Sequence, residues 1–203
     1  MEPLITLTSR AVPLTLANIN TDQLFPARFI KKPRAVGYAQ YLFHDIRRTD
    51  DGQLSPEFSL NQSKFDGAKI LVAGPNFGSG SSREGAVYAL YDSGFRVILA
   101  PSFGEIFASN CLKNGMLTAR LNTDVIHQIQ TELTTTENPE LAIDIAKETL
   151  VTNAGAEMRL DLDPFQKHCL MNGLNEIDLS LEFDDAITRF ESDYRKAFPW
   201  ITS

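Results

Sequence analysis

The chain has 203 residues, 26 acidic side chains against 19 lysines and arginines, a net charge of −7, and 43% hydrophobic residues. This is the composition of an ordinary soluble globular protein, and a chain of this length can bury roughly 70% of its extended surface. The negative charge argues against a nucleic-acid binder, because phosphate binding needs clustered lysines and arginines. Two cysteines, Cys111 and Cys169, are too few for a disulfide framework, an iron–sulfur cluster or a structural zinc site.

The first ten residues lack the basic and apolar stretches of a signal peptide, and no segment approaches the ~18 consecutive apolar residues of a membrane span. With so few cysteines, the chain is expected in the reducing cytoplasm. The three histidines are scattered without the spacing of metal ligands, so we expect no metal site in this chain.

The first half of the chain predicts a βαβ unit preceded by a strand. Residues 4–16 are rich in β-formers and lead into a polar loop at 18–22, whereas residues 47–63 are polar and predict an exposed, mobile connection. Two short apolar runs predict buried strands on either side of a helix. The expected order is strand 69–74, helix 83–92 and strand 95–100.

The second half is expected to continue the α/β pattern. Ser102 and Glu105 have the spacing of a capping box and predict a helix that Gly115 terminates. An amphipathic helical extension is expected at residues 174–203, from the spaced apolar side chains between Ile177 and Tyr194. The remaining elements are expected as helix 103–114, strand 116–121, helix 124–133, a hairpin in which 153–155 joins 141–152 to 158–162, and helix 164–173.

The most informative segment is the loop at residues 74–84, Gly-Pro-Asn-Phe-Gly-Ser-Gly-Ser-Ser-Arg-Glu, between a predicted strand and a predicted helix. Its glycines allow the backbone to approach a ligand, and the following helix presents unpaired N–H groups, so the corner is expected to bind an anion. A Walker A loop is excluded because no lysine lies between Lys69 and Lys113. A dinucleotide fingerprint fails because Arg83 stands in place of the third glycine.

The loop combines two hydroxyls, Ser81 and Ser82, with the guanidinium of Arg83. The planar guanidinium of an arginine can bind a carboxylate through two parallel hydrogen bonds. The free energy of forming a serine alkoxide is lower beside an arginine and a helix N-terminus. Ser81 is therefore a candidate for proton transfer. The alternative is a tight turn in which the serines only cap the helix.

Several segments make the sequence resemble the small subunits of 3-isopropylmalate dehydratase, which are similar to the swivelling C-terminal domain of aconitases. The resemblance covers nearly the whole chain. It is carried by residues 18–23 (Asn-Ile-Asn-Thr-Asp-Gln), the loop 76–84, residues 94–115, residues 165–174 and the terminal Pro199-Trp200.

The resemblance implies one α/β swivelling domain of the β/β/α type over residues 1–203. It implies a hydro-lyase of leucine biosynthesis that interconverts 2-isopropylmalate and 3-isopropylmalate through the alkene 2-isopropylmaleate. Ser81 matches the base, Arg83 matches the arginine that binds a substrate carboxylate, and Ser82 belongs to the same turn. No cofactor is expected on this chain. A large partner subunit, in a heterodimer or heterotetramer, is expected to hold a four-iron, four-sulfur cluster.

Five more residues complete the expected substrate site: Asn76 and Gly80 in the loop, Asp22 in the polar loop near the N-terminus, and Arg28 and Lys31 in the segment that follows. The resemblance implies that this last segment helps to select the substrate side chain. For Asp22, an Asx-turn or helix cap is an equal alternative. For the basic segment, the alternative is a solvated surface patch.

The chain departs from the family pattern at two positions. Gly85 stands where the family usually has a histidine, and Ser79 stands where a cysteine is common. Glycine in the first turns of a helix costs up to ~1 kcal/mol relative to alanine. Two alternatives therefore stay open: a related dehydratase for another 2-hydroxy diacid, such as homoaconitate or a methylmalate, and a non-catalytic anion-binding module.

Overall fold

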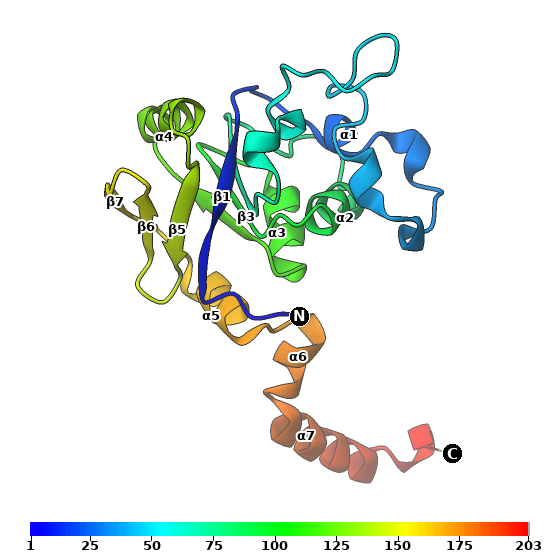
Figure 1. Cartoon of the computed structure of the whole chain (residues 1–203). Helices are drawn as coiled ribbons and strands as arrows, with labels where there is room; N and C mark the ends of the chain where they lie inside the picture. Colours follow the sequence, from blue (N-terminus) through cyan, green and yellow to red (C-terminus); the bar gives the residue numbers. More distant parts are fainter. Residues whose placement is uncertain (203) are drawn as a thin grey trace.

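The computed structural model describes residues 1–202, which form one seven-stranded sheet, seven helices and short 3₁₀ turns (Figure 1). The strands are β1 (Thr6–Leu14), β2 (Ile70–Ala73), β3 (Val97–Ala100), β4 (Leu117–Arg120), β5 (Glu140–Asp144), β6 (Thr149–Thr152) and β7 (Glu157–Arg159). The helices are α1 (Thr21–Leu24), α2 (Glu84–Asp92), α3 (Glu105–Lys113), α4 (Thr123–Thr135), α5 (Pro164–Asn172), α6 (Glu176–Leu181) and α7 (Asp184–Ala197). No helix among these residues is both long and apolar enough to cross a membrane.

The sheet has the order β4-β3-β2-β1-β5-β6-β7, and β1 joins its two halves. Residues 11–14 of β1 pair in parallel with β2, whereas residues 6–10 pair antiparallel with β5. The burial of β1 follows this division, because the second half is buried throughout and the first half alternates with exposed positions. One half of the sheet is therefore a parallel α/β unit and the other an antiparallel meander.

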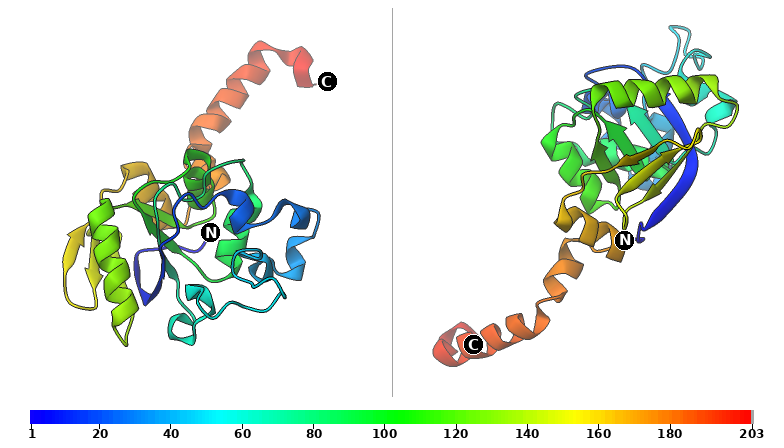
Figure 2. Two further views of the ribbon diagram at one scale, coloured as in Figure 1. Left: turned by 90° about the horizontal axis from the view of Figure 1, so that it is seen from above. Right: turned by 90° about the vertical axis from the view of Figure 1, so that its left-hand side faces the viewer.

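Helices cover both faces of the parallel half, which explains why its strands read as continuous apolar runs. On one face Leu71 and Ile98 pack with residues of α2 and α3. On the other face Val72 and Leu99 pack with residues of α4. Figure 2 shows this helix, in light green, alongside the sheet. The predicted βαβ unit is confirmed.

A third group of elements, between β1 and β2, packs over α2 through aromatic rings. Phe25 is fully buried and stacks on Tyr38 with ring centroids 4.5 Å apart. The polar connection at 47–63 is mostly exposed over residues 49–57, as predicted, but Phe58 is buried against Phe43, with centroids 5.6 Å apart. This contact anchors the connection to the core.

Two predictions of local structure are wrong. Ser102 does not cap the helix that follows, because α3 begins after Gly104 and the Ser102 hydroxyl accepts a hydrogen bond from the Asn76 backbone N–H at 2.8 Å. The segment 141–152 is not one arm of a hairpin but two strands, β5 and β6, which turn at Glu148 with a left-handed φ of 57°. The turn at 153–155 then joins β6 to β7.

The helix after residue 163 forms as predicted. Asp163 caps α5 by accepting from the N–H groups of Phe165 and Gln166, both at 3.0 Å, and Gly173 ends it with a left-handed φ of 66°. Beyond it, α6 and α7 form the expected helical extension. They project away from the rest of the molecule in all three views (Figures 1 and 2).

Candidate active site

The site lies where the parallel strands β1, β2 and β3 end at the same edge of the sheet. The loop after β1 leads to α1, the loop after β2 contains residues 74–83, and the loop after β3 leads to α3. Carboxyl ends of adjacent parallel strands form the usual ligand crevice of an α/β sheet. Segments far apart in sequence meet here for this reason.

Gly78 in the central loop and Gly104 before α3 are required by a close approach of these two segments. Gly78 has a φ of 72°, and a Cβ there would lie 2.2 Å from the Phe107 ring. A Cβ on Gly104 would lie 2.5 Å from the carbonyl oxygen of Gly78. Neither position has room for a side chain, so the loop and the start of α3 approach one another backbone to backbone.

Hydrogen bonds also tie this loop to α1. The Thr21 hydroxyl donates to the carbonyl of Ser81 at 2.8 Å, and the Thr21 N–H donates to the carbonyl of Ser79 at 2.9 Å. Asn20 and Gln23 form a capping box that fixes the start of α1. These bonds place Asp22, the second residue of α1, beside the loop.

Asp22 and Arg83 form an ion pair across the two loops. The Arg83 side chain is 22% exposed and that of Asp22 is 54% exposed. An arginine paired with a carboxylate in this way is positioned to exchange it for another carboxylate. The sequence predicted both residues for the site but not their contact.

A cavity of about 220 Å³ lies beside this pair. It is lined from the loop by Gly80, Ser81, Ser82 and Arg83 and from the helices by Thr21, Glu105, Ile106, Phe107 and Asn110, together with Gly78 and Gly104. Ser81 and Ser82 are exposed, and no side chain caps α2. The alternative in which the serines serve as helix caps is therefore wrong.

Two helices begin at this cavity, α2 directly after Arg83 and α3 directly after Gly104. Each nine-residue helix carries a partial positive charge and unpaired N–H groups at its start. With Arg83 between them, the cavity suits a ligand with negative charge.

The contribution of α3 to this cavity was missed in the sequence. Glu105 was interpreted as half of a capping box, but it is the first residue of α3 and lines the cavity. Asn110, a largely buried polar residue, follows Ile106 at a spacing of four residues on the same helix. That spacing, within the helix predicted at 103–114, was the available signal.

Asn76 lies in the loop but does not line the cavity. Its side-chain amide donates to the Asn18 side chain at 2.9 Å, and its N–H donates to Ser102. Both asparagines adopt left-handed backbone conformations, with φ of 58° and 57°. Asn76 therefore joins the three loops that frame the cavity.

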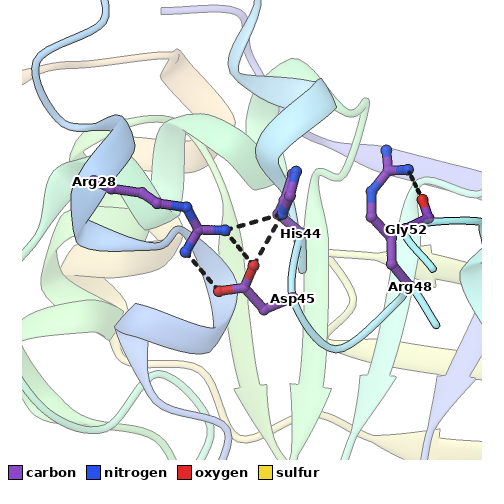
Figure 3. A network of polar contacts seen from close by, with 5 residues as sticks. All are labelled: Arg28, His44, Asp45, Arg48 and Gly52. Atoms are coloured by element: carbon purple, nitrogen blue, oxygen red, sulfur yellow. Dashed lines mark hydrogen bonds and ion pairs between the residues drawn. The ribbon is translucent and has the colours of Figure 1, made fainter. Parts of the chain in front are cut away.

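Arg28 and Lys31 are exposed and lie outside the lining of the cavity. Arg28 donates to Asp45 at 2.8 Å and contacts the His44 ring at 3.2 Å (Figure 3). This arginine and the histidine lower the pKa of Asp45 to about 2. The charge of Arg28 is thus partly neutralised within the chain.

Gly85, in the first turn of α2, contacts the aromatic group that packs over this helix. A Cβ at this position would lie 2.9 Å from the Phe25 ring. Because that ring is buried and stacked on Tyr38, it has little freedom to move. The absence of a side chain at Gly85, where the family usually has a histidine, therefore leaves room for the packed Phe25 ring.

The residues described here do not form a ligand set for a metal or cluster. Among residues 1–202 no three His, Cys, Asp or Glu side chains lie close enough together to hold an ion. Cys111 and Cys169 are both buried, and burial raises the pKa of the Cys111 thiol.

Comparison with known proteins identifies the fold. Residues 1–124 match the family model described as the aconitase C-terminal domain. A crystal structure of 3-isopropylmalate dehydratase from Methanocaldococcus jannaschii has the same fold, with a TM-score of 0.65 at 24% identity, over 92% of this chain and 99% of that one. The fold and the loop between β2 and α2 thus define an α/β domain of the aconitase C-terminal class, as the sequence predicted.

Relatives matched over their full length identify the family of this chain within that class. The 3-isopropylmalate dehydratase small subunit of Paramagnetospirillum magneticum is 40% identical over 201 residues, which cover 99% of this chain and all of the relative. That of Roseobacter denitrificans is 41% identical over the same length and coverage. The chain belongs to the family of 3-isopropylmalate dehydratase small subunits.

Proposed function

We propose that this chain is the small subunit of a cytoplasmic hydro-lyase that interconverts 2-isopropylmalate and 3-isopropylmalate through 2-isopropylmaleate. The names of the full-length relatives support the reaction. The observation that carries the proposal is the single cavity at which Ser81, Arg83 and the starts of two helices meet. The unpaired N–H groups at the two helix starts and the Arg83 guanidinium suit a carboxylate of a small dicarboxylate, with the acidic Glu105 also in the lining.

The chemistry assigned to this chain is removal and return of one proton. Ser81 Oγ, as the alkoxide, takes the proton from the carbon adjacent to the one that bears the hydroxyl group. The electron pair of the broken C–H bond forms the double bond, and the hydroxyl group leaves toward the large subunit, where a bound cluster would act as the Lewis acid that accepts it. In the hydration direction, the Ser81 hydroxyl returns the proton to carbon. The starts of α2 and α3 and the Arg83 guanidinium stabilise the alkoxide.

Arg83 binds a substrate carboxylate in this proposal. As the proton leaves, negative charge builds up on that carboxylate, and a guanidinium with nearby N–H groups stabilises it where it develops. Substrate must compete with Asp22 for Arg83, since the two side chains are paired in the free chain. Asp22 therefore keeps Arg83 ordered before substrate arrives.

The other half of the active site belongs to a large subunit, as expected from a small-subunit family. The donor set of this chain does not fit an iron–sulfur cluster, because its two cysteines are buried and isolated. We assign the four-iron, four-sulfur cluster to the large subunit for this reason. The two chains form a heterodimer or a heterotetramer around the shared site.

The test is an anaerobic assay of 2-isopropylmalate conversion that follows the alkene by ultraviolet absorbance. Activity is expected only when the chain is mixed with its cluster-loaded large subunit. A mixture that forms a complex with an intact cluster but does not convert 2-isopropylmalate would refute the proposal. Parallel assays with homoaconitate and a methylmalate then identify a related dehydratase.

Ser81→Ala tests the assigned base within the same assay. Loss of its hydroxyl should lower kcat on the order of 10²–10⁴-fold while the variant still co-purifies with the large subunit. Ser63→Ala, at an exposed serine outside the cavity, is the matched control and should keep full activity. Turnover retained by Ser81→Ala would remove Ser81 from the mechanism.

A further inference from the structure

The cavity of the active site has an exposed mouth and a buried floor. At the mouth, Ser81, Ser82 and Glu105 are exposed. Two of the polar side chains that the structure describes in the lining are buried at the floor: Thr21 is 3% exposed and Asn110 is 9% exposed. The proposed reaction uses the groups of the loop and gives Asn110 no role.

The two polar side chains of the floor differ in their hydrogen bonds. The Thr21 hydroxyl donates to the carbonyl oxygen of Ser81 at 2.8 Å. The side-chain amide of Asn110, in contrast, makes no hydrogen bond within residues 1–202. Its backbone carbonyl accepts from the backbone N–H and the side-chain amide of Asn114, at 3.2 and 2.9 Å. The Asn110 amide is therefore the unused polar group of the floor.

A buried amide without a partner destabilises the fold that contains it. Buried polar side chains in proteins have a partner in the large majority of cases for this reason. The neighbours of Asn110 on α3 include Phe107 and Cys111, which belong to the apolar core, so an apolar side chain at position 110 would serve folding at least as well. Because Asn110 lines the cavity, a bound molecule can supply the missing partner.

The structure holds Asn110 in place before any ligand binds. Asn110 lies in the middle of α3, one turn after Phe107 on the same side of the helix. The Phe107 ring packs edge-on against Phe77, with centroids 5.5 Å apart, and fills the space beside Gly78. A donor on a packed helix loses little conformational freedom when it binds a ligand.

The other groups of the cavity indicate which ligand atom suits the amide. The Arg83 guanidinium and the N–H groups at the starts of α2 and α3 suit a carboxylate. A carboxylate has about four lone-pair positions, and a bidentate arginine occupies two of them. The Asn110 amide carries two N–H donors, one of which can occupy a remaining position. It does so without adding a charge to the site.

We propose that Asn110 is a substrate-binding residue whose Nδ2 donates a hydrogen bond to a substrate carboxylate in the cavity. The inference rests on the proposed function and extends the site from the loop after β2 to the middle of α3. No proton is transferred to or from Asn110. Its role is to bind and orient the diacid, and the absence of a partner for the amide in the free chain follows from that role. An amide that holds only a water molecule is the competing outcome of the tests.

The first test is the kinetics of Asn110→Leu in complex with the cluster-loaded large subunit. Leucine has the same number of side-chain heavy atoms and the same branch point, but it has no donor. Loss of a hydrogen bond to a charged group should raise KM for 2-isopropylmalate roughly 10–150-fold. The value of kcat should change little, because the bond is present in the bound substrate as well as in the transition state.

Asn61→Leu is the matched control, since Asn61 is a partly buried asparagine outside the cavity with all of its hydrogen bonds formed. Its side chain accepts from the guanidinium of Arg47 at 2.9 and 2.6 Å and donates to the carbonyls of Arg47 and Ser55, both at 2.8 Å. Asn61→Leu should keep the wild-type KM.

Urea unfolding of the isolated chain separates binding from a structural role. Asn110→Leu should keep the wild-type midpoint or raise it, because it removes a buried polar group that has no partner. Asn61→Leu should lower the midpoint, since it leaves the partners of four hydrogen bonds without their bonds. This comparison needs no catalytic activity.

Asn110→Asp tests the donor itself. The aspartate carries a negative charge and repels a substrate carboxylate, whereas its protonated form has an O–H donor. The ratio of its KM to the wild-type KM should therefore fall as pH decreases from about 8 to about 6, where the buried acid becomes protonated. Arg83 and Glu105 also face the cavity, but they are the same in both proteins and affect both KM values.

Two results would overturn the inference. If the KM of Asn110→Leu stays within about twofold of the wild-type value, the amide does not bind the substrate. If Asn110→Leu lowers the urea midpoint, the amide stabilises the fold and a raised KM reports distortion of the site. A wild-type complex that does not convert 2-isopropylmalate refutes the proposed function and this inference with it. A wild-type complex that converts it while Asn110→Leu keeps the same KM refutes the inference alone.

Discussion

Replacement of Gly85 by alanine is expected to destabilise the chain, although alanine is the better helix former. In an exposed helix this change would gain about 1 kcal/mol. Here the new Cβ would lie 2.9 Å from one carbon of the Phe25 ring and 3.0 Å from the next. Phe25 is fully buried and stacked on Tyr38, so the ring cannot easily move aside.

The expected change in the free energy of unfolding follows from these two opposing effects. Overpacking of a filled core costs about 1–3 kcal/mol. Set against the gain in helix propensity, it leaves a net loss of about 1 kcal/mol, which lowers Tm by about 2–4 °C in a chain of this size. Thermal and urea unfolding of the isolated chain measure this difference.

A double-mutant cycle with Phe25→Val isolates the contact. Valine suits the extended backbone at position 25 and removes the ring atoms that Gly85 approaches. In that background Gly85→Ala should become neutral or stabilising. A Gly85→Ala chain that melts above the wild type would refute the close contact, and an unchanged effect in the Phe25→Val background would assign it to another neighbour.

Three further predictions concern single groups. Ser102→Ala should cost about 1 kcal/mol in urea unfolding, because the Asn76 N–H loses its acceptor; an unchanged midpoint would contradict that role. Since the folded pKa of Asp45 is about 2 against 3.8, the stability from its pairing with Arg28 is present above pH 3.8 and lost as pH falls through 2. The free energy of unfolding, measured with urea, should therefore decrease less from pH 5 to pH 2.5 for Arg28→Ala than for the wild type. Equal decreases would exclude the pair. Cys111 should resist a thiol reagent until the chain unfolds, since burial raises its pKa; rapid labelling of the folded chain would contradict this burial.

The centre of the site was predictable because its chemistry is contiguous in the sequence. Ser81, Ser82 and Arg83 lie on one turn between a buried strand and a helix, and that context was visible in the apolar run before them. The ion pair between Asp22 and Arg83 was not visible. It depends on β1 and β2 being parallel neighbours, which brings loops 61 residues apart to the same edge.

The capping prediction at Ser102 failed because a local pattern was outweighed by a distant backbone group. The spacing to Glu105 is that of a capping box, but the close approach of Gly104 to Gly78 determines where α3 begins. The Ser102 hydroxyl then accepts from Asn76, 26 residues earlier in the chain. Side-chain hydroxyls that hydrogen-bond outside their own segment cannot be assigned from spacing alone.

The basic segment shows the same limitation for charge. The resemblance implied that the segment with Arg28 and Lys31 helps to select the substrate side chain, and a solvated basic patch was the alternative. In the fold, Arg28 pairs with Asp45, 17 residues further on, and lies outside the lining of the cavity. Whether a charged side chain is available to a ligand depends on partners that the tertiary structure brings to it.

Because β1 pairs with two strands, part of it stays unpaired during synthesis of the chain on the ribosome. During synthesis, residues 6–10 leave the ribosome early, yet β5, to which they pair, follows about 130 residues later. At typical rates of elongation this is a wait of roughly 10 s with an open strand edge. Exposed positions alternate along this part of the strand, and Thr6, Thr8 and Arg10 are polar. Such residues disfavour premature pairing with other nascent chains until the partner strand emerges.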